Sequence, residues 1–267
     1  MTDSGNPFET LVTAPPNIPF TQQLADLKLD PEKQLKISER LDHFLSLIAT
    51  LNPDDQEKIE AATLAMLDLH KDQNDRPDGM PYNSHPLEVA RTVIEDFDVR
   101  DIDLITVALF HDAIEDQASK LVMANIENHD DIQAAAFDEI RTRYGDRVVS
   151  ILQKLTNPDF DEIATRQVSP QNVEEFVAKK NELYKDHVEL AIQDDDALVI
   201  KLADFTHNTS DASQLLDPAK KEKYRRKYVP VIEVFINRLE REDIPCPISN
   251  KEAAISKLKA IEAKFGS

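Results

Sequence analysis

Hydrophobic residues recur at helical intervals along most of the chain. In 37–48 and 231–239 the large apolar side chains stand three and four positions apart, which is the repeat of one buried helix face. The same pattern predicts helices over 31–50, 53–72, 86–97, 101–116, 134–144, 146–156, 170–193, 195–209, 218–241 and 249–264. The chain is therefore expected to be all-α.

Four dipeptides agree with this prediction because they combine a short polar capping residue with proline at the first helical position. They are Asp30-Pro31, Asn52-Pro53, Ser169-Pro170 and Asp217-Pro218. One segment, 197–203 (ALVIKLA), has the composition of a buried strand. The chain offers no second strand of similar quality to pair with it, so we expect helix there too.

Proline and glycine indicate the boundaries of the fold. Residues 1–20 contain four prolines and little periodicity, which predicts a mobile arm. We then expect an N-terminal helical extension at 21–52, a main domain at 53–241 and a C-terminal helix within 242–267. The whole chain has only 4 glycines, too few for turn-rich β folds or glycine-rich phosphate loops.

The charge balance excludes several classes of function. The 267 residues include 51 Asp and Glu against 31 Lys and Arg, a net charge of −20, so binding to nucleic acid or to an anionic membrane is disfavoured. The single cysteine, Cys246, can form neither an internal disulfide nor a thiolate metal cluster. The N-terminus has no leader pattern and no apolar run is long enough to span a membrane, so we expect a cytoplasmic protein.

Polar groups that can bind a metal follow an apolar run. The segment HDAIED (111–116) comes directly after LITVALF and carries one imidazole and three carboxylates on adjoining helix stripes. Four such groups at one helix end are costly without a cation. A second His-Asp pair, 129–130, lies in a polar stretch, and we expect it to be a solvated loop. His43, His70 and His187 are expected at surface or boundary positions.

Two further segments supply ligands of the same type. His85 stands immediately before a proline at a helix start, and Asp204 lies in an apolar segment with Asn208 one turn further on. An unpaired buried aspartate would cost several kcal/mol, so Asp204 needs a partner. We therefore predict one divalent ion, held by two imidazoles and two carboxylates: His85, His111, Asp112 and Asp204.

In this order, PYNSHP (81–86), HDAIED (111–116) and KLADFTHN (201–208) resemble the motifs of the HD-superfamily hydrolase domain of the RelA/SpoT family. The similarity is strongest to the single-domain small alarmone hydrolases, which include the metazoan SpoT homologues, and it covers roughly 55–240. The resemblance implies an all-helical HD bundle and a manganese ion. It also implies removal of the 3′-pyrophosphate from (p)ppGpp, which gives GDP or GTP.

Carried over by position, the resemblance assigns the same four metal ligands. It also makes Glu115 and Asp116 the catalytic pair and places Tyr82 and Asn208 near the nucleotide. A divalent ion lowers the pKa of water and polarises a phosphoryl oxygen. With the two carboxylates to move protons, such a site would hydrolyse a phosphoric ester or anhydride.

The chain departs from the family pattern where the substrate binds. Asn74 and Asp75 stand where relatives usually carry a basic pair, and Phe205 stands where Arg or Lys is common. The segment 117–137 is also longer than the usual link. The basic stretch KKEKYRRKY (220–228) is therefore our candidate for binding phosphate, with Arg225 supplying charge and Tyr228 stacking on a base.

Two other functions stay open at this point. The chain could be an HD phosphohydrolase that acts on another nucleotide, or a catalytically silent HD domain that senses nucleotides or serves as an interaction module. The intact His, His, Asp, Asp set favours an enzyme, whereas the three departures keep the silent alternative open. If the chain is a hydrolase of (p)ppGpp or of another nucleotide, its expected partner is that small-molecule nucleotide. The chain could also form a homo-oligomer.

Overall fold

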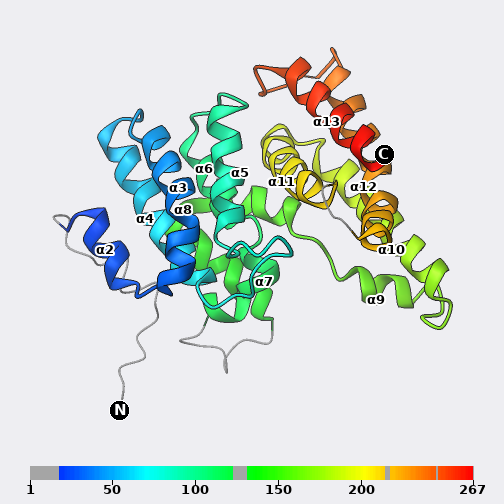
Figure 1. The fold of residues 1–267 in the computed structure, drawn as a ribbon, viewed down its shortest axis with the longest axis horizontal. Coiled ribbons are helices and arrows are strands. Elements are labelled where there is room, and N and C mark those ends of the chain that lie inside the picture. Colours follow the sequence, from blue (N-terminus) through cyan, green and yellow to red (C-terminus); the bar gives the residue numbers. More distant parts are fainter. Residues whose placement is uncertain (1–17, 123–130, 214–216, 245, 267) are drawn as a thin grey trace. The chain divides into compact units, whose positions relative to one another are not determined.

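The computed structural model describes residues 18–122, 131–213, 217–244 and 246–266. Most of the predicted arm, the His129-Asp130 pair and the middle of the 117–137 segment lie outside these residues. Within them the secondary structure is helical, with turns between the helices and no strand (Figure 1). The all-α prediction is confirmed, and it includes 197–203, which lies inside a helix.

The chain divides into two compact units, Met1–Gln153 and Lys154–Ser267. The helices of the first unit are α2 (Phe20–Asp26), α3 (Pro31–Ile48), α4 (Pro53–His70), α5 (Ser84–Glu95), α6 (Ile102–Phe110) and α7 (Ala113–Leu121). Next comes α8 (Ile132–Leu155), which begins in the first unit and ends just past its last residue. The second unit continues with α9 (Phe160–Thr165), α10 (Val173–Ala191), α11 (Asp195–Ser213), α12 (Pro218–Glu240) and α13 (Lys251–Gly266). The predicted domain boundaries stay predictions.

Three of the four predicted proline starts are confirmed. The side chains of Asp30, Asn52 and Asp217 accept hydrogen bonds from backbone N–H groups in the first turns of α3, α4 and α12. The start at Ser169-Pro170 is wrong, because α10 begins three residues later behind Asn172. The Asn172 side chain accepts from the Glu175 amide and donates to the Glu175 carboxylate, a reciprocal cap that sets the helix start.

The predicted single helix over 101–116 is wrong, because α6 and α7 are separate helices with His111 and Asp112 between them. At the break the side chain of His111 bonds back to the preceding turn. Its Nδ1 lies 2.8 Å from the Ala108 carbonyl oxygen, the acceptor that the Asp112 amide would use in a continuous helix. The predicted separation of 134–144 from 146–156 is confirmed at Gly145, whose φ of 89° interrupts α8.

The helices α2 and α9 were not expected. With 7 and 6 residues, each is too short to show two turns of a hydrophobic repeat. In the first unit the core is formed mainly by α4, α5 and α6, which bury most of their apolar residues. In the second unit Phe205 and Phe235 are fully buried, with ring centroids 4.8 Å apart. No helix among the described residues has the length and apolarity that crossing a bilayer requires.

Candidate metal centre

The site is built in the first unit around the start of α5 and the break between α6 and α7. His85 is the second residue of α5, and its side chain is only 1% exposed. A turn at Gly79, whose φ is 81°, precedes it, with the Gly79 amide bonded to the Arg76 carbonyl. Glycine adopts such a φ without strain. The turn therefore forms readily and leads the chain into α5, where the His85 side chain is buried.

The break between α6 and α7 positions the other two ligands. His111 is 4% exposed, and because its Nδ1 donates to the Ala108 carbonyl, its Nε2 keeps a lone pair that can bind a metal. Asp112 adopts φ −97° and ψ −4°, and its backbone carbonyl accepts from the Asp116 amide at the start of α7. The break therefore directs two adjacent side chains toward one point.

Three donor atoms converge at that point. His111 Nε2 lies 3.1 Å from His85 Nε2 and 3.2 Å from Asp112 Oδ2, and His85 Nε2 lies 3.4 Å from the same oxygen. Two ligands at about 2.1 Å from one ion and at a right angle are separated by about 3 Å, so the spacing fits a shared cation. Among the described residues, these three alone form such a group of His, Cys, Asp or Glu donors.

The electrostatics favour an ionised carboxylate at the centre. Burial would raise the pKa of Asp112, but the charges and hydrogen bonds of His111 and His85 outweigh burial and lower the pKa well below its ordinary value. The Tyr82 hydroxyl donates to Asp112 Oδ2 at 2.6 Å. Burial and the nearby Asp112 and Asp116 carboxylates raise the pKa of Tyr82, so it stays a protonated donor. A hydrogen bond of this kind orients a metal-binding carboxylate.

The predicted catalytic pair lies in the first turn of α7, where Glu115 and Asp116 are both exposed. Asp116 Oδ2 accepts from Gln73 Nε2 at 2.8 Å. The contact between Gln73 and Asp116 could not be predicted from the sequence, because nothing in the spacing of the two residues indicates it. His70, expected at a surface or boundary position, is instead 1% exposed, and its ring stacks on that of Tyr82 with centroids 5.0 Å apart.

Asp204 and Asn208 lie on α11 in the second unit. Asp204 is 8% exposed, and its Oδ1 accepts from Asn208 Nδ2 at 2.5 Å. The predicted spacing of one helical turn is therefore correct, and the two side chains interact. The role of Asp204 as fourth ligand and that of Asn208 near the nucleotide stay predictions.

The remaining two candidates lie on α12. Arg225 is exposed, and its guanidinium binds the Glu222 carboxylate at 2.5 and 2.8 Å. Tyr228 is 8% exposed, and Tyr224 stacks against its ring with an interplanar angle of 4°. Phe205 packs edge-on against the same ring, with centroids 5.6 Å apart. Tyr228 therefore contributes to an aromatic cluster of the second unit, and its stacking on a base stays a prediction.

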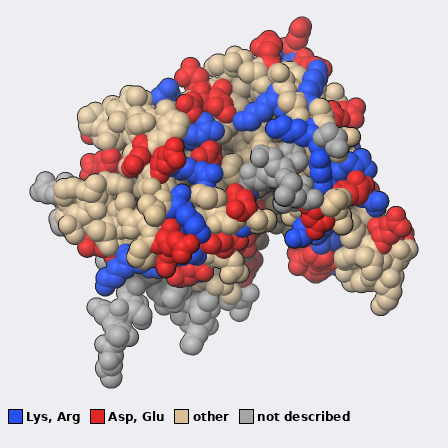
Figure 2. Space-filling model, viewed as in Figure 1, with Lys and Arg blue, Asp and Glu red and all other residues tan. Residues whose placement is uncertain are grey.

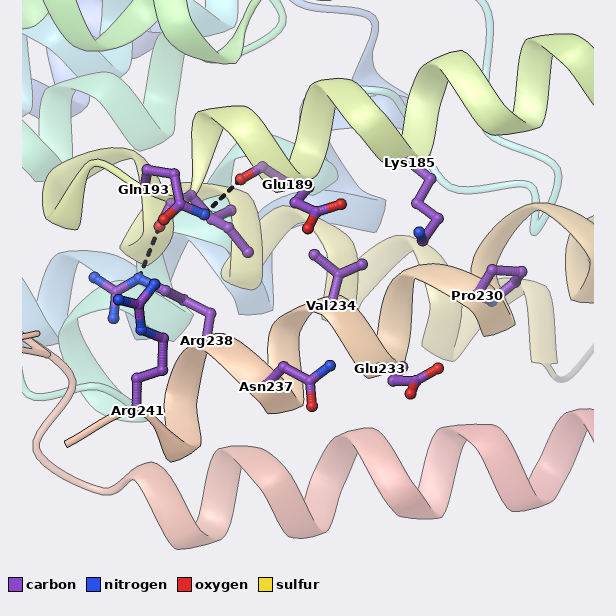
Figure 3. Close-up of a pocket in the computed structure, with 10 residues that line it drawn as sticks. Lys185, Glu189, Gln193, Pro230, Glu233, Val234, Asn237, Arg238 and Arg241 are labelled. Atoms are coloured by element: carbon purple, nitrogen blue, oxygen red, sulfur yellow. Dashed lines mark hydrogen bonds between the residues drawn. The ribbon is translucent and has the colours of Figure 1, made fainter. Parts of the chain in front are cut away.

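A separate pocket of about 290 Å³ lies between α10 and α12 in the second unit (Figure 3). Its lining mixes signs of charge, with Lys185, Arg238 and Arg241 facing Glu189 and Glu233. Arg238 is already engaged, because it donates to the Ile192 carbonyl and to Asp195. None of the predicted site residues lines this pocket.

Comparisons with known proteins find an HD-domain family and relatives named as (p)ppGpp hydrolases. The sequence profile of a family described as HD domain matches residues 61–240. The bifunctional (p)ppGpp synthase/hydrolase SpoT of Escherichia coli (strain K12) is 26% identical over 194 residues, which are 72% of this chain and 23% of SpoT. The guanosine-3′,5′-bis(diphosphate) 3′-pyrophosphohydrolase of Danio rerio is 31% identical over 88 residues, 33% of this chain and 38% of that protein. The chain thus spans well under two thirds of these curated relatives.

A solved structure has a similar fold. It represents a metazoan ortholog of SpoT that is described as hydrolysing ppGpp, and it superposes with a TM-score of 0.52 at 16% sequence identity. The match covers 76% of this chain and 94% of the other. At this identity the similarity shows a shared fold.

Proposed function

This chain belongs to the HD-domain family, and from that premise we propose that it is a manganese-dependent hydrolase that removes the 3′-pyrophosphate of (p)ppGpp. The observation that carries the proposal is the convergence of His85, His111 and Asp112 donor atoms within 3.4 Å of one another. Relatives with 3′-pyrophosphohydrolase names match the chain over 194 and 88 residues. The single cysteine suits a reducing compartment, and we place the protein in the cytoplasm.

The three converging side chains, with Asp204 as the proposed fourth, would hold the ion. When bound there, a divalent ion supplies Lewis acidity to a phosphoryl oxygen and makes water more acidic. Manganese is our choice because the RelA/SpoT resemblance implies it, and a set of imidazoles and carboxylates can bind a divalent ion of this kind. Tyr82 orients Asp112 through its hydroxyl, and the His111 ring is fixed by the Ala108 carbonyl.

Glu115 and Asp116 are the pair that we propose for proton transfer. Both carboxylates are exposed in the first turn of α7, where they can orient a water molecule and take its proton. The water oxygen then bonds to the phosphorus next to the ribose 3′-oxygen, and the bond between that phosphorus and the 3′-oxygen breaks. The proton passes to the 3′-oxygen, so that ppGpp and water give GDP and pyrophosphate.

One observation favours a second candidate, an HD phosphohydrolase acting on a less charged nucleotide. The unit that holds the three donors has 13 Lys and Arg against 30 Asp and Glu, a formal charge of −17. Acidic and basic side chains are interspersed on the face shown in Figure 2. Asp75 pairs with Lys33 at 3.4 Å, which further reduces the charge available to phosphates. A highly anionic substrate therefore depends on the metal and on cations such as Arg225.

A nucleotide panel tests both candidates. Manganese-loaded protein is incubated with ppGpp, pppGpp, GTP, dGTP and a dinucleotide cofactor phosphate, and the products are separated by ion-exchange chromatography. We expect GDP and pyrophosphate from ppGpp, and no product with the Asp112→Ala variant. Faster turnover of another nucleotide, with ppGpp intact, would replace the proposed substrate. A fully folded, metal-loaded protein without turnover of any nucleotide would favour a silent domain.

A further inference from the structure

The backbone of Gln73 is hydrogen-bonded to two helices of the first unit. Its amide donates to the His70 carbonyl at the end of α4 (3.0 Å), and its carbonyl accepts from Lys33 Nζ of α3 (2.9 Å). Lys120 of α7 reaches the same end of α4 and donates to the Leu69 carbonyl at 2.8 Å. The Cα position of Gln73 is thus fixed, and its side chain starts from a defined point.

The side chain of Gln73 makes three hydrogen bonds that admit one orientation of its amide. Its Nε2 donates to Asp116 Oδ2 at 2.8 Å, while its Oε1 accepts from Gln117 Nε2 at 2.8 Å and from His70 Nδ1 at 2.7 Å. A flipped amide would direct its oxygen at a carboxylate. Burial lowers the pKa of His70, although the bond to Gln73 acts in the opposite direction. His70 is therefore a neutral ring that donates from Nδ1.

The helix itself does not fix Asp116. Gln117 has φ −134° and ψ 17°, so α7 leaves helical geometry directly after the Glu115-Asp116 pair. Asp116 is exposed, and an exposed side chain at a distorted turn has several rotamers open to it. The bond from Gln73 selects one of them, together with the side-chain hydrogen bond to Asp116 that contributes to the raised pKa of Tyr82.

We infer that Gln73 is a positioning residue that holds the Asp116 carboxylate in the orientation needed for proton transfer; this inference rests on the proposed function. Gln73 does not touch the reacting atoms and acts through Asp116. His70 and Gln117 lock its amide, so that the bond donor points at Asp116 before substrate binds. Supporting contacts of this kind are worth on the order of 10- to 100-fold in activity.

A double-mutant cycle between Gln73 and Asp116 tests the inference. Gln73→Leu, Asp116→Asn and the double variant are compared with wild type for kcat, KM and bound manganese. We expect Gln73→Leu to lower kcat about 10- to 100-fold, with KM and metal content within about threefold of wild type. In the Asp116→Asn background the same change should cost less than about threefold, because the partner through which it acts is gone.

Two more variants separate positioning from folding. Gln73→Glu keeps the size of the side chain but directs an oxygen at Asp116, and it should lower kcat at least as much as Gln73→Leu while its circular dichroism and Tm stay near wild type. Gln56→Leu is the matched control, because it removes a glutamine–carboxylate bond of the same type, to Glu60 at 2.7 Å on α4. We expect it to leave kcat unchanged.

The cycle is measured on ppGpp and on whichever nucleotide wild type hydrolyses fastest. If wild type hydrolyses ppGpp but the losses at Gln73 and Asp116 multiply fully, or if only KM changes, the positioning role is wrong and the proposed function stands. If wild type prefers another nucleotide and the cycle on it shows the expected coupling, the proposed substrate is wrong and the role of Gln73 stands.

Discussion

The hydroxyl of Tyr82 offers the clearest single-atom test of the metal centre. Tyr82→Phe removes the 2.6 Å hydrogen bond to Asp112 Oδ2 and leaves the ring, which stacks on His70 and meets the His85 ring edge-on at 6.1 Å between centroids. The fold should therefore persist. We expect the variant to bind the divalent ion more weakly than wild type, because the Asp112 carboxylate is no longer held toward the two histidines.

The structure sets the size of this effect. A hydrogen bond to a charged group contributes about 1.5–3 kcal/mol, which corresponds to a factor of about 10 to 150 in an equilibrium constant. The Asp112 side chain is 23% exposed, so water can replace part of the lost bond. We therefore expect manganese to bind Tyr82→Phe about 10- to 30-fold more weakly than wild type.

The assay is manganese titration by isothermal calorimetry, repeated in competition with a chelator of known affinity. Tyr144→Phe is the control, because the Tyr144 ring lies in the same unit and packs on Phe110 at 5.0 Å. A manganese Kd for Tyr82→Phe within threefold of wild type, in a folded protein, would refute the reasoning. A raised KM with an unchanged metal Kd would favour instead the role near the nucleotide that the resemblance implies.

Three further predictions concern turnover, stability and pH. Glu115→Gln should lower kcat at least tenfold with metal content unchanged, and near-wild-type kcat with metal bound would move proton transfer to another residue. Phe205→Arg, which restores the charge common in relatives, should destabilise the protein by about 3–5 kcal/mol in urea unfolding, because the side chain is 1% exposed; an unchanged midpoint would contradict that burial. Since burial lowers the pKa of His70 below 6.5, the unfolded chain binds a proton that the folded protein excludes. The free energy of unfolding should thus decrease as the pH drops below 6.5, by up to about 1.4 kcal/mol per pH unit. The His70→Gln variant should show a smaller slope, and an equal slope in both proteins would mean that another group takes up the proton.

The parts of the fold that follow local rules could be predicted from the sequence. Asp30, Asn52 and Asp217 cap their own helices, so each start depends on a few neighbouring residues. Ser169 failed as a start because a stronger reciprocal cap lies three residues further on at Asn172. The break before α7 could not be predicted from periodicity, because the polar residues of 111–116 continue the helical spacing of the apolar run before them.

The residues of the candidate site also divide into those that the sequence indicates and those that it does not. His85, His111 and Asp112 stood out because polar groups in apolar surroundings need partners, and the structure brings them together. The role proposed for Gln73 depends on a contact across 43 sequence positions, from the loop after α4 to α7. No spacing rule reports such a contact. His70, expected at a surface or boundary position, is also held by a contact outside its own helix, because its ring is buried against Tyr82.

The reaction itself is tested most directly by hydrolysing ppGpp in water enriched in ¹⁸O with manganese-loaded protein and analysing the products by mass spectrometry. Attack of water on the phosphorus next to the 3′-oxygen predicts pyrophosphate that carries one ¹⁸O atom, together with unlabelled GDP in equal amount. Orthophosphate as the first product, label in the GDP, or intact ppGpp beside a rapidly hydrolysed second nucleotide would contradict the assignment of this chain as a 3′-pyrophosphohydrolase.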